Sequence, residues 1–168
     1  MQALALSLGI GRATLYRRVK SRDHLLGEVV WFLTRIALAR SLSPTPGRSG
    51  AERLGLVIDR FMHDVHDQPA LRRLLESEPE IALRILTSKH GPVQPGITRA
   101  LQRLLERELG LDGNDSLVDP ATLAFLIVRI GESFLYADVI AGHDADIDGA
   151  TKVLAVLLRS AVTLHAVS

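Results

Sequence analysis

The chain has 168 residues, enough for one domain or for a small domain joined to a larger one. Hydrophobic residues make up 47% of it and aromatic residues only 4%, a composition that favours helices over strands. The absence of cysteine excludes a disulfide scaffold, a thiolate zinc site and a cysteine nucleophile, and it agrees with a reducing compartment.

The charges are distributed unevenly behind a net charge of +1. Residues 1–22 carry four Arg and one Lys against no acid, whereas the rest of the chain carries 15 basic and 19 acidic side chains. A basic tip on a mildly acidic body indicates that the tip meets a polyanion, although a solvated basic face gives the same pattern.

Neither a secretory signal nor a membrane span is visible in the sequence. No basic segment followed by an apolar stretch and a cleavage site opens the chain. The longest apolar run, Leu123 to Val128, falls far short of the roughly 20 residues that a membrane span needs. We therefore expect a cytoplasmic protein with no membrane partner.

The first predicted elements are three helices. A short helix over Gln2–Leu8 places Leu4 and Leu8 on one side and ends at Gly9. A second short helix spans Arg12–Val19. Ser21 is a good N-cap for a third helix that runs to about Ser41, with Asp23 in its first turn.

The pattern then predicts a loop, "SLSPTPGRSG", and six more helices. They cover 51–66, a short stretch from Pro69, another from Pro79, 97–109, a long apolar helix from Pro120 to near Gly142, and a last one after 144–148 to about His165. A loop, "GLDGNDSLVD", separates two of them. No run alternates in the way of a strand, so we predict an all-α fold in two parts, residues 1–22 and 23–168.

The first two helices have the spacing of a helix-turn-helix. Ala5 is small where the two helices cross, and Gly9 lies in the turn, where a positive φ is needed. Ile10 plugs the turn to the core, and Leu15 lies on the inner side of the second helix. An N-terminal helix-turn-helix, part of a three-helix DNA-binding unit, is therefore expected.

A helix of this size fits the major groove of B-DNA. Its outer side holds the predicted DNA-binding residues, with two more just beyond its end: Arg12, Ala13, Thr14, Tyr16, Arg17, Lys20 and Arg22. Arg12, Thr14 and Arg17 are expected to read bases, and Tyr16, Lys20 and Arg22 to hold phosphates. The alternatives are a core packing role for Tyr16 and a pairing of Arg18 with Asp23 or solvent.

The stretch "LALSLGIGRATLYRRVKSRDHLL" resembles the DNA-binding end of the TetR/AcrR-type one-component repressors. "ESEPEIALRILTSK" and "GESFLYADVIAG" further resemble the QsdR-like group, which is associated with control of lactone breakdown. The resemblance implies a homodimeric repressor that binds double-stranded operator DNA and is released by a small effector bound in the larger, helical part.

Two departures from the family pattern matter. Val19 stands where the family usually has Phe, and no helix precedes the one that begins at Gln2. Leu4, Leu8 and Leu15 then lose one wall of their small core, at a cost of roughly 1.5–3 kcal/mol for each exposed side chain. We therefore expect residues 1–20 to be poorly ordered alone and this form to bind DNA weakly.

The last long helices are too apolar to be covered by one small body, so a homodimer with a four-helix interface is expected over a monomer. Trp31, Phe61, Arg129 and Tyr136 are the predicted ligand-binding residues, for a small apolar effector with a lactone or carboxylate group. The alternatives are plain core packing for Trp31 and Phe61, and an intrahelical pair of Arg129 with Glu132.

Other kinds of chemistry have weaker patterns. One set of side chains could form a metal site, although chance gives the same spacing: His63, Asp64 and His66, with His90 or His143. Three acids are typical of a solvated helix start: Glu76, Glu78 and Glu80. No GxSxG motif or phosphate loop is present. We expect no enzyme, no metal and no cofactor. The alternative function is a helical binding and dimerisation module that does not touch DNA.

Overall fold

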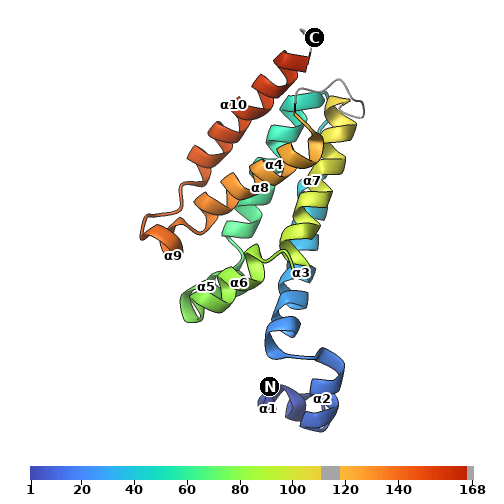
Figure 1. Cartoon of the computed structure of the whole chain (residues 1–168), viewed down its shortest axis with the longest axis vertical. Helices are drawn as coiled ribbons and strands as arrows, with labels where there is room; N and C mark the ends of the chain where they lie inside the picture. The colour runs from blue at the N-terminus through green and yellow to red at the C-terminus, as the bar shows by residue number, and fades with distance from the viewer. Residues whose placement is uncertain (111–117, 166–168) are drawn as a thin grey trace.

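The computed structural model describes residues 1–110 and 118–165, and within these residues every regular element is a helix (Figure 1). The predicted all-α fold is confirmed. In chain order the helices are α1 (Gln2–Ser7), α2 (Arg12–Val19), α3 (Arg22–Ser41), α4 (Gly50–His66), α5 (Pro69–Ser77), α6 (Pro79–Thr87), α7 (Val93–Leu109), α8 (Pro120–Leu135), α9 (Ala137–Ala141) and α10 (Ile147–His165).

Two short helices form the amino-terminal tip. Gly9 has φ +64°, as the turn requires, and its N–H donates to the Leu6 carbonyl while the Ile10 N–H donates to the Ala5 carbonyl. This pair of bonds is the Schellman motif that ends helices in a left-handed residue. Ala5 and Leu15 are buried, as expected at the crossing of α1 and α2. Leu15 thus keeps its burial, although Leu4 and Leu8 are exposed.

The link between α2 and α3 is a single tight turn. Lys20 has φ +62° and ψ −63°, and the Ser21 N–H donates to the Val19 carbonyl at 2.7 Å, which makes a γ-turn. Ser21 then caps α3 as predicted, because its hydroxyl accepts from the His24 N–H at 3.0 Å. With so short a link, the position of α2 depends directly on that of α3.

The remaining helices pack along α3 into a body, away from α1 and α2 (Figure 1). One cluster of buried side chains lies between α4, α7, α8 and α10, with Leu54, Leu105 and Leu158 fully buried in it. A second cluster lies between α3, α5, α6 and α7, around Ala82 and Val93. The helix α3 therefore connects the tip to the core of the body.

Two helix boundaries differ from the sequence prediction. The helix α7 begins at Val93 instead of residue 97, because Pro92 takes the N-cap position and Pro95 lies in the first turn, where no N–H is needed. The long helix from Pro120 is interrupted at Tyr136, whose φ of −114° separates α8 from α9. Most of the predicted loop 110–119 lies outside the described residues.

Two helices end at the glycines predicted from the sequence. Gly110 ends α7 with φ +64°, and Gly142 ends α9 with φ +67°. Within the part of the chain that the structure describes, no helix is long and apolar enough to cross a membrane.

Candidate DNA-binding helix and ligand cavity

The helix α2 presents its basic side chains to solvent. Arg12, Ala13 and Arg17 are exposed, together with Lys20 just beyond the helix, while Leu15 turns inward. Thr14 and Tyr16 are half-buried. The sequence-predicted DNA-binding residues of α2 therefore share the outer side of one short helix, and no acidic residue lies between Met1 and Arg22.

The Tyr16 side chain is half-buried and contacts Arg12. The Arg12 guanidinium lies over its ring, with 5.5 Å between the Arg12 Cζ and the ring centroid. This contact spans one helical turn and holds the Arg12 side chain along α2. Arg12 is thereby positioned at the amino-terminal end of α2, the end that comes nearest the bases when such a helix enters the major groove.

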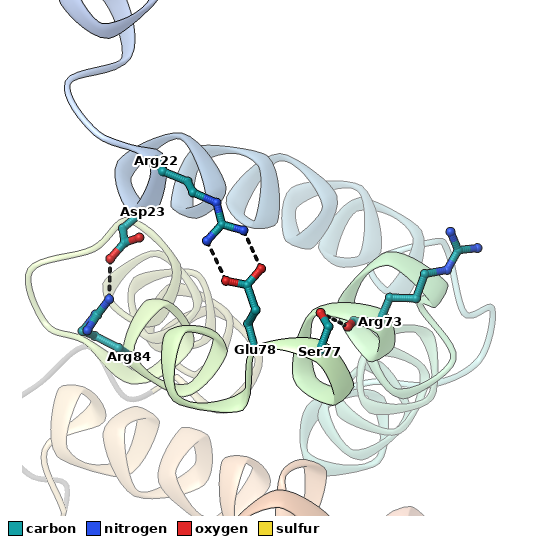
Figure 2. A network of polar contacts seen from close by, with 6 residues as sticks. All are labelled: Arg22, Asp23, Arg73, Ser77, Glu78 and Arg84. Carbon is teal, nitrogen blue, oxygen red and sulfur yellow. Dashed lines mark hydrogen bonds and ion pairs between the residues drawn. The ribbon is translucent and has the colours of Figure 1, made fainter. Parts of the chain in front are cut away.

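Arg22 is placed differently from the other candidate DNA-binding residues, because it pairs with the body (Figure 2). Its Nη1 donates to Glu78 Oε2 at 2.6 Å, and its Nη2 donates to Glu78 Oε1. Glu78 is the residue that joins α5 to α6. Next to this pair, Arg84 of α6 donates to the Asp23 carboxylate. We call these two contacts the α3–α6 ion pairs.

In the α3–α6 ion pairs, each partner segment supplies one base and one acid. Helix α3 supplies Arg22 and Asp23, and the segment opposite supplies Glu78 and Arg84. The bidentate contact lowers the pKa of the Glu78 carboxyl below its usual value, through the Arg22 hydrogen bonds and charge. The pair thus survives mild acid and is lost only as the pH falls through that lowered pKa. The first turn of α3 is attached to α6 by charge as well as by packing.

The body encloses a cavity of about 110 Å³. Helices α3, α4, α7 and α8 provide most of its wall, and α5, α6 and α10 each add a residue. The lining is mostly aliphatic, with Phe61 as an aromatic side chain and Met62 as a sulfur-bearing one. Leu42, which is exposed, belongs to the lining, so the cavity reaches the surface near the end of α3. A largely apolar cavity of this kind suits a small organic molecule.

A few polar residues break the apolar lining: Thr34, Asp64, Gln68, Glu132 and Tyr136. Burial raises the pKa of the Glu132 carboxyl, and the charge of Arg129 opposes that rise. The pKa of Tyr136 is raised by burial and then by the negative charge of Glu132, so its phenol stays protonated. Glu132 and Tyr136, one helical turn apart, form the polar end of the cavity.

Two of the four sequence-predicted ligand-binding residues, Phe61 and Tyr136, line the cavity. Trp31 lies outside the lining, because it follows Val30 by one position and turns toward Gly96 of α7. Arg129 also lies outside it: its side chain is 47% exposed and its Nη1 donates to Glu132 Oε2 at 2.5 Å. The intrahelical pair considered as an alternative for Arg129 is present.

Sequence reasoning did not assign Thr34, Asp64, Gln68 or Glu132 to the cavity. Glu132 had a visible signal, since it is an acid within the apolar run of α8. The other three belong to helix faces of ordinary polarity, and only the packing of α3, α4 and α5 brings them to one wall. No group of three or more His, Asp or Glu side chains suited to a metal ion occurs within residues 1–110 and 118–160.

The outer sides of α8 and α10 carry several large apolar side chains, beside exposed charged ones such as Arg129 and Lys152. Phe125 and Leu126 of α8 and Val153 and Val156 of α10 are all exposed, and Phe125 is 48% exposed. Both helices pack their other sides into the body, and they lie in contact with each other. The two helices thus present one uncovered apolar surface.

A family model described as "Tetracyclin repressor-like, C-terminal domain" matches residues 49–159. Among solved structures, this fold is similar to that of the transcriptional repressor QsdR of R. erythropolis, described as being from the TetR family. The TM-score is 0.81 and the sequence identity 30%, over 94% of this chain and 83% of the QsdR chain. The chain belongs to the TetR family.

Membership of the TetR family confirms the recognition made from "LALSLGIGRATLYRRVKSRDHLL". It makes the chain a transcriptional regulator, with α1 and α2 as its helix-turn-helix and the later helices as its ligand-binding domain. Regulators of the TetR family are generally not enzymes. No curated protein matches the chain.

Proposed function

We propose that this TetR-family chain is a homodimeric repressor that acts in the cytoplasm. Its α2 helix enters the major groove of operator DNA, and a small, mainly apolar effector in the cavity releases it. The boundary between its two functional parts is placed at residues 22 and 23, where α3 begins. The observation that carries the proposal is the pairing of an outward-facing basic α2 with an apolar cavity, both attached to one helix, α3.

DNA contact is assigned to the outer side of α2. Arg12, Thr14 and Arg17 are placed to read base edges, with Ala13 offering a small apolar contact. Tyr16 and Lys20 are placed to hold phosphates. Arg22 makes a weaker candidate for a phosphate contact than it did from sequence, because its guanidinium already engages Glu78 on both nitrogens.

Operator binding is tested with duplexes that the protein itself selects from a random library. A regulator that holds phosphates through basic side chains loses affinity steeply as salt rises, whereas a module that does not use DNA shows no selected duplex even at low salt. That second outcome would favour the alternative function, a binding and dimerisation module. The exposure of Leu4, Leu6 and Leu8 on α1 is the observation that supports the alternative.

Within the selected duplex, Arg17 and Arg18 form a matched pair. Both are exposed arginines of α2, one position apart, and only Arg17 is placed on the groove-facing side. We expect Arg17→Ala to weaken binding about tenfold or more and to relax the preference at one base position, since a bidentate base contact is worth about 1–3 kcal/mol. Arg18→Ala should have a smaller effect, equal for all sequences. Equal losses with no change in preference would contradict base reading by Arg17.

Effector release is assigned to a tilt of α3. Val30, Thr34 and Ala37 of α3 line the cavity, and so does Leu86 of α6, so a bound molecule touches both helices that the α3–α6 ion pairs join. A molecule that prefers a different spacing of the two helices shifts the start of α3 and, through the short link at Lys20, moves α2. In a dimer this changes the distance between the two recognition helices.

A further inference from the structure

Two hydrogen-bonding atoms at the polar end of the cavity are available to a bound molecule. Tyr136 is only 4% exposed, and its hydroxyl makes no hydrogen bond within the described residues. Arg129 donates to Glu132 Oε2, which leaves Oε1 without a donor in the same part of the chain. Among the described residues, the fully buried polar side-chain atom without a partner is Thr45 Oγ1, so these two atoms keep some access to solvent or to the cavity. A ligand that reaches both of them gains affinity and orientation.

The charge of the lining selects the kind of head group. Asp64 and Glu132 are the charged residues among the described lining, and neither Lys, Arg nor His joins them there. Arg129 reaches Glu132 from outside the lining, and its half-exposed side chain leaves its charge screened by solvent. Arg129 offsets part of the Glu132 charge, yet the described lining itself supplies two acids and neither Lys, Arg nor His, so a carboxylate would add a like charge. A cation would be attracted there.

We propose that the effector cavity takes a small aliphatic amine, held by its ammonium group at Glu132 and Tyr136. The inference rests on the proposed function of the cavity as the effector site. The ammonium has three donors and no acceptor, so it can donate to Glu132 Oε1 and to the Tyr136 hydroxyl oxygen at once. Asp64 adds a second acidic side chain to the same lining.

The size and lining of the cavity set the length of the aliphatic chain. A volume of about 110 Å³ is somewhat less than that of an engineered apolar cavity of about 150 Å³ that binds benzene. A chain of about four to six carbons matches this volume. Phe61, Leu101 and Leu154 supply apolar wall away from the polar end. This chemistry differs from the lactone or carboxylate group expected from the sequence, which Arg129 or Tyr136 was to anchor.

The test compares head groups on one chain length. Binding of n-pentylamine, n-pentanol and n-pentanoate to the full chain is measured at neutral pH by ligand-observed NMR and calorimetry. We expect pentylamine to bind at least about tenfold more tightly than pentanoate and more tightly than pentanol. Equal or tighter binding of pentanol or pentanoate would overturn the proposal, and so would the failure of all three to bind.

Variants assign the head group to its site. Glu132→Gln should weaken pentylamine binding about tenfold while changing pentanol binding less than about threefold, and Tyr136→Phe should weaken pentylamine about threefold. Asp64→Asn, a substitution on a different helix, should also weaken pentylamine binding, and it tests the proposal if Glu132→Gln fails to fold. Glu80→Gln, an exposed acid outside the cavity, is the matched control and should leave binding unchanged. Unchanged pentylamine binding in folded variants of both Glu132 and Asp64 would overturn the proposal.

Failure of this inference is distinguishable from failure of the proposed function. The same preparations are assayed for selected duplex DNA without any amine. Duplex binding together with tighter pentanol or pentanoate binding would support the proposed regulator and contradict the amine as its ligand. Pentylamine binding without duplex binding would support the amine site and contradict DNA binding, as in a module that does not use DNA.

Discussion

At the scale of single residues, α7 packs closely against the Trp31 ring of α3 at a glycine, Gly96. A Cβ atom added at Gly96 would lie 2.3–2.8 Å from three ring carbons of Trp31. The indole is a rigid ring and cannot fold away, so the side chain of Trp31 can pack on α7 only where that helix has no side chain. Gly96 thereby fixes where the wall of the body next to the cavity meets α3.

Gly96→Ala is therefore expected to destabilise the protein. Overpacking of this kind costs about 1–3 kcal/mol, which exceeds the gain in helix propensity. Gly55→Ala is a matched control, because Gly55 is also a helical glycine and its added Cβ would meet nothing within 4 Å. The free energy of unfolding of Gly55→Ala should rise by about 0.5–1 kcal/mol. Urea unfolding followed by the fluorescence of Trp31, the single tryptophan, measures both. A Gly96→Ala protein as stable as wild type would contradict this packing.

His63 connects α4 to α10 through its charge. Its Nδ1 lies 3.0 Å from the Asp59 carbonyl oxygen, and its Nε2 lies 3.5 Å from Asp148 Oδ1. The hydrogen bond to the Asp59 carbonyl raises the pKa of His63 above 6.5, and the carboxylates of Asp59 and Asp148 add to the rise. Protonation of this histidine therefore favours the folded chain.

The pH dependence has a definite sign. Because the folded-state pKa of His63 is raised, its stabilisation is fully present below the unfolded value of about 6.5 and is lost as the pH rises through the folded pKa. His63→Gln should cost stability at about pH 5.5 and little at about pH 8.5. In NMR titrations, Asp148→Asn should lower the pKa of His63. A stability cost that grows with pH would contradict the contact.

At the scale of elements, the start of α3 is where the proposed coupling between the cavity and α2 is expected to pass. The α3–α6 ion pairs attach this start to α6, and the γ-turn at Lys20 attaches it to α2 (Figure 2). The pairs are about half-exposed, so they contribute little to stability but define one position of α3 against α6. Their role is expected in coupling, not in folding.

Glu78→Gln should therefore reduce the change in DNA affinity caused by a bound effector, by at least about threefold, with the chain still folded. The measurement is duplex affinity with and without effector. Glu80→Gln, an exposed acid on the same helix α6, is the control and should preserve the response. An unchanged response in Glu78→Gln would contradict a coupling role for the pair.

A charge exchange separates coupling from direct DNA contact by Arg22. Arg22→Glu alone should disturb the response because it sets two acids against each other, and adding Glu78→Arg should restore the pair in the reverse sense. If the double variant recovers both the response and DNA affinity, Arg22 acts through Glu78. If DNA affinity stays low in both, Arg22 holds a phosphate.

At the scale of the whole molecule, the uncovered apolar surface of α8 and α10 is where a second copy is expected to bind. Two antiparallel helices from each copy would form a four-helix interface related by a two-fold axis. Such a dimer carries two α2 helices, and two half-sites on DNA are separated by about 34 Å for one turn of duplex. The proposed dimer would allow one short helix in each chain to give specific binding.

Phe125→Glu should convert the dimer to monomers, because it places a charge at the centre of the expected interface. Phe32→Glu is the matched control, since Phe32 is 61% exposed but lies on α3, outside the apolar surface of α8 and α10. Sedimentation equilibrium measures the mass of each variant. A Phe125→Glu protein with the mass of a dimer would show that another surface joins the two copies.

Much of the local structure could be predicted from the sequence. Gly9, Ser21 and Gly110 end or begin helices for reasons carried by each residue itself, a permitted positive φ or a capping hydroxyl, and all three behave as predicted. The family was also recognisable, because the tip motif is contiguous. The start of α7 was missed because the prolines of "KHGPVQPG" were interpreted as a break, whereas Pro92 and Pro95 fit the beginning of the helix. The break at Tyr136 was missed because the apolar spacing continues across it.

The site was decided only by tertiary structure. Glu78 joins Arg22 across 56 positions, and Asp64 meets Glu132 at one cavity although they belong to different helices. Trp31 faces Gly96 because of the direction in which α3 packs on α7, which the apolar pattern of α3 leaves open. The sequence by itself determined which residues begin, end and charge each helix, because those properties act within a few positions. The fold decided which side chains face one another, because that depends on how helices distant in sequence are packed together.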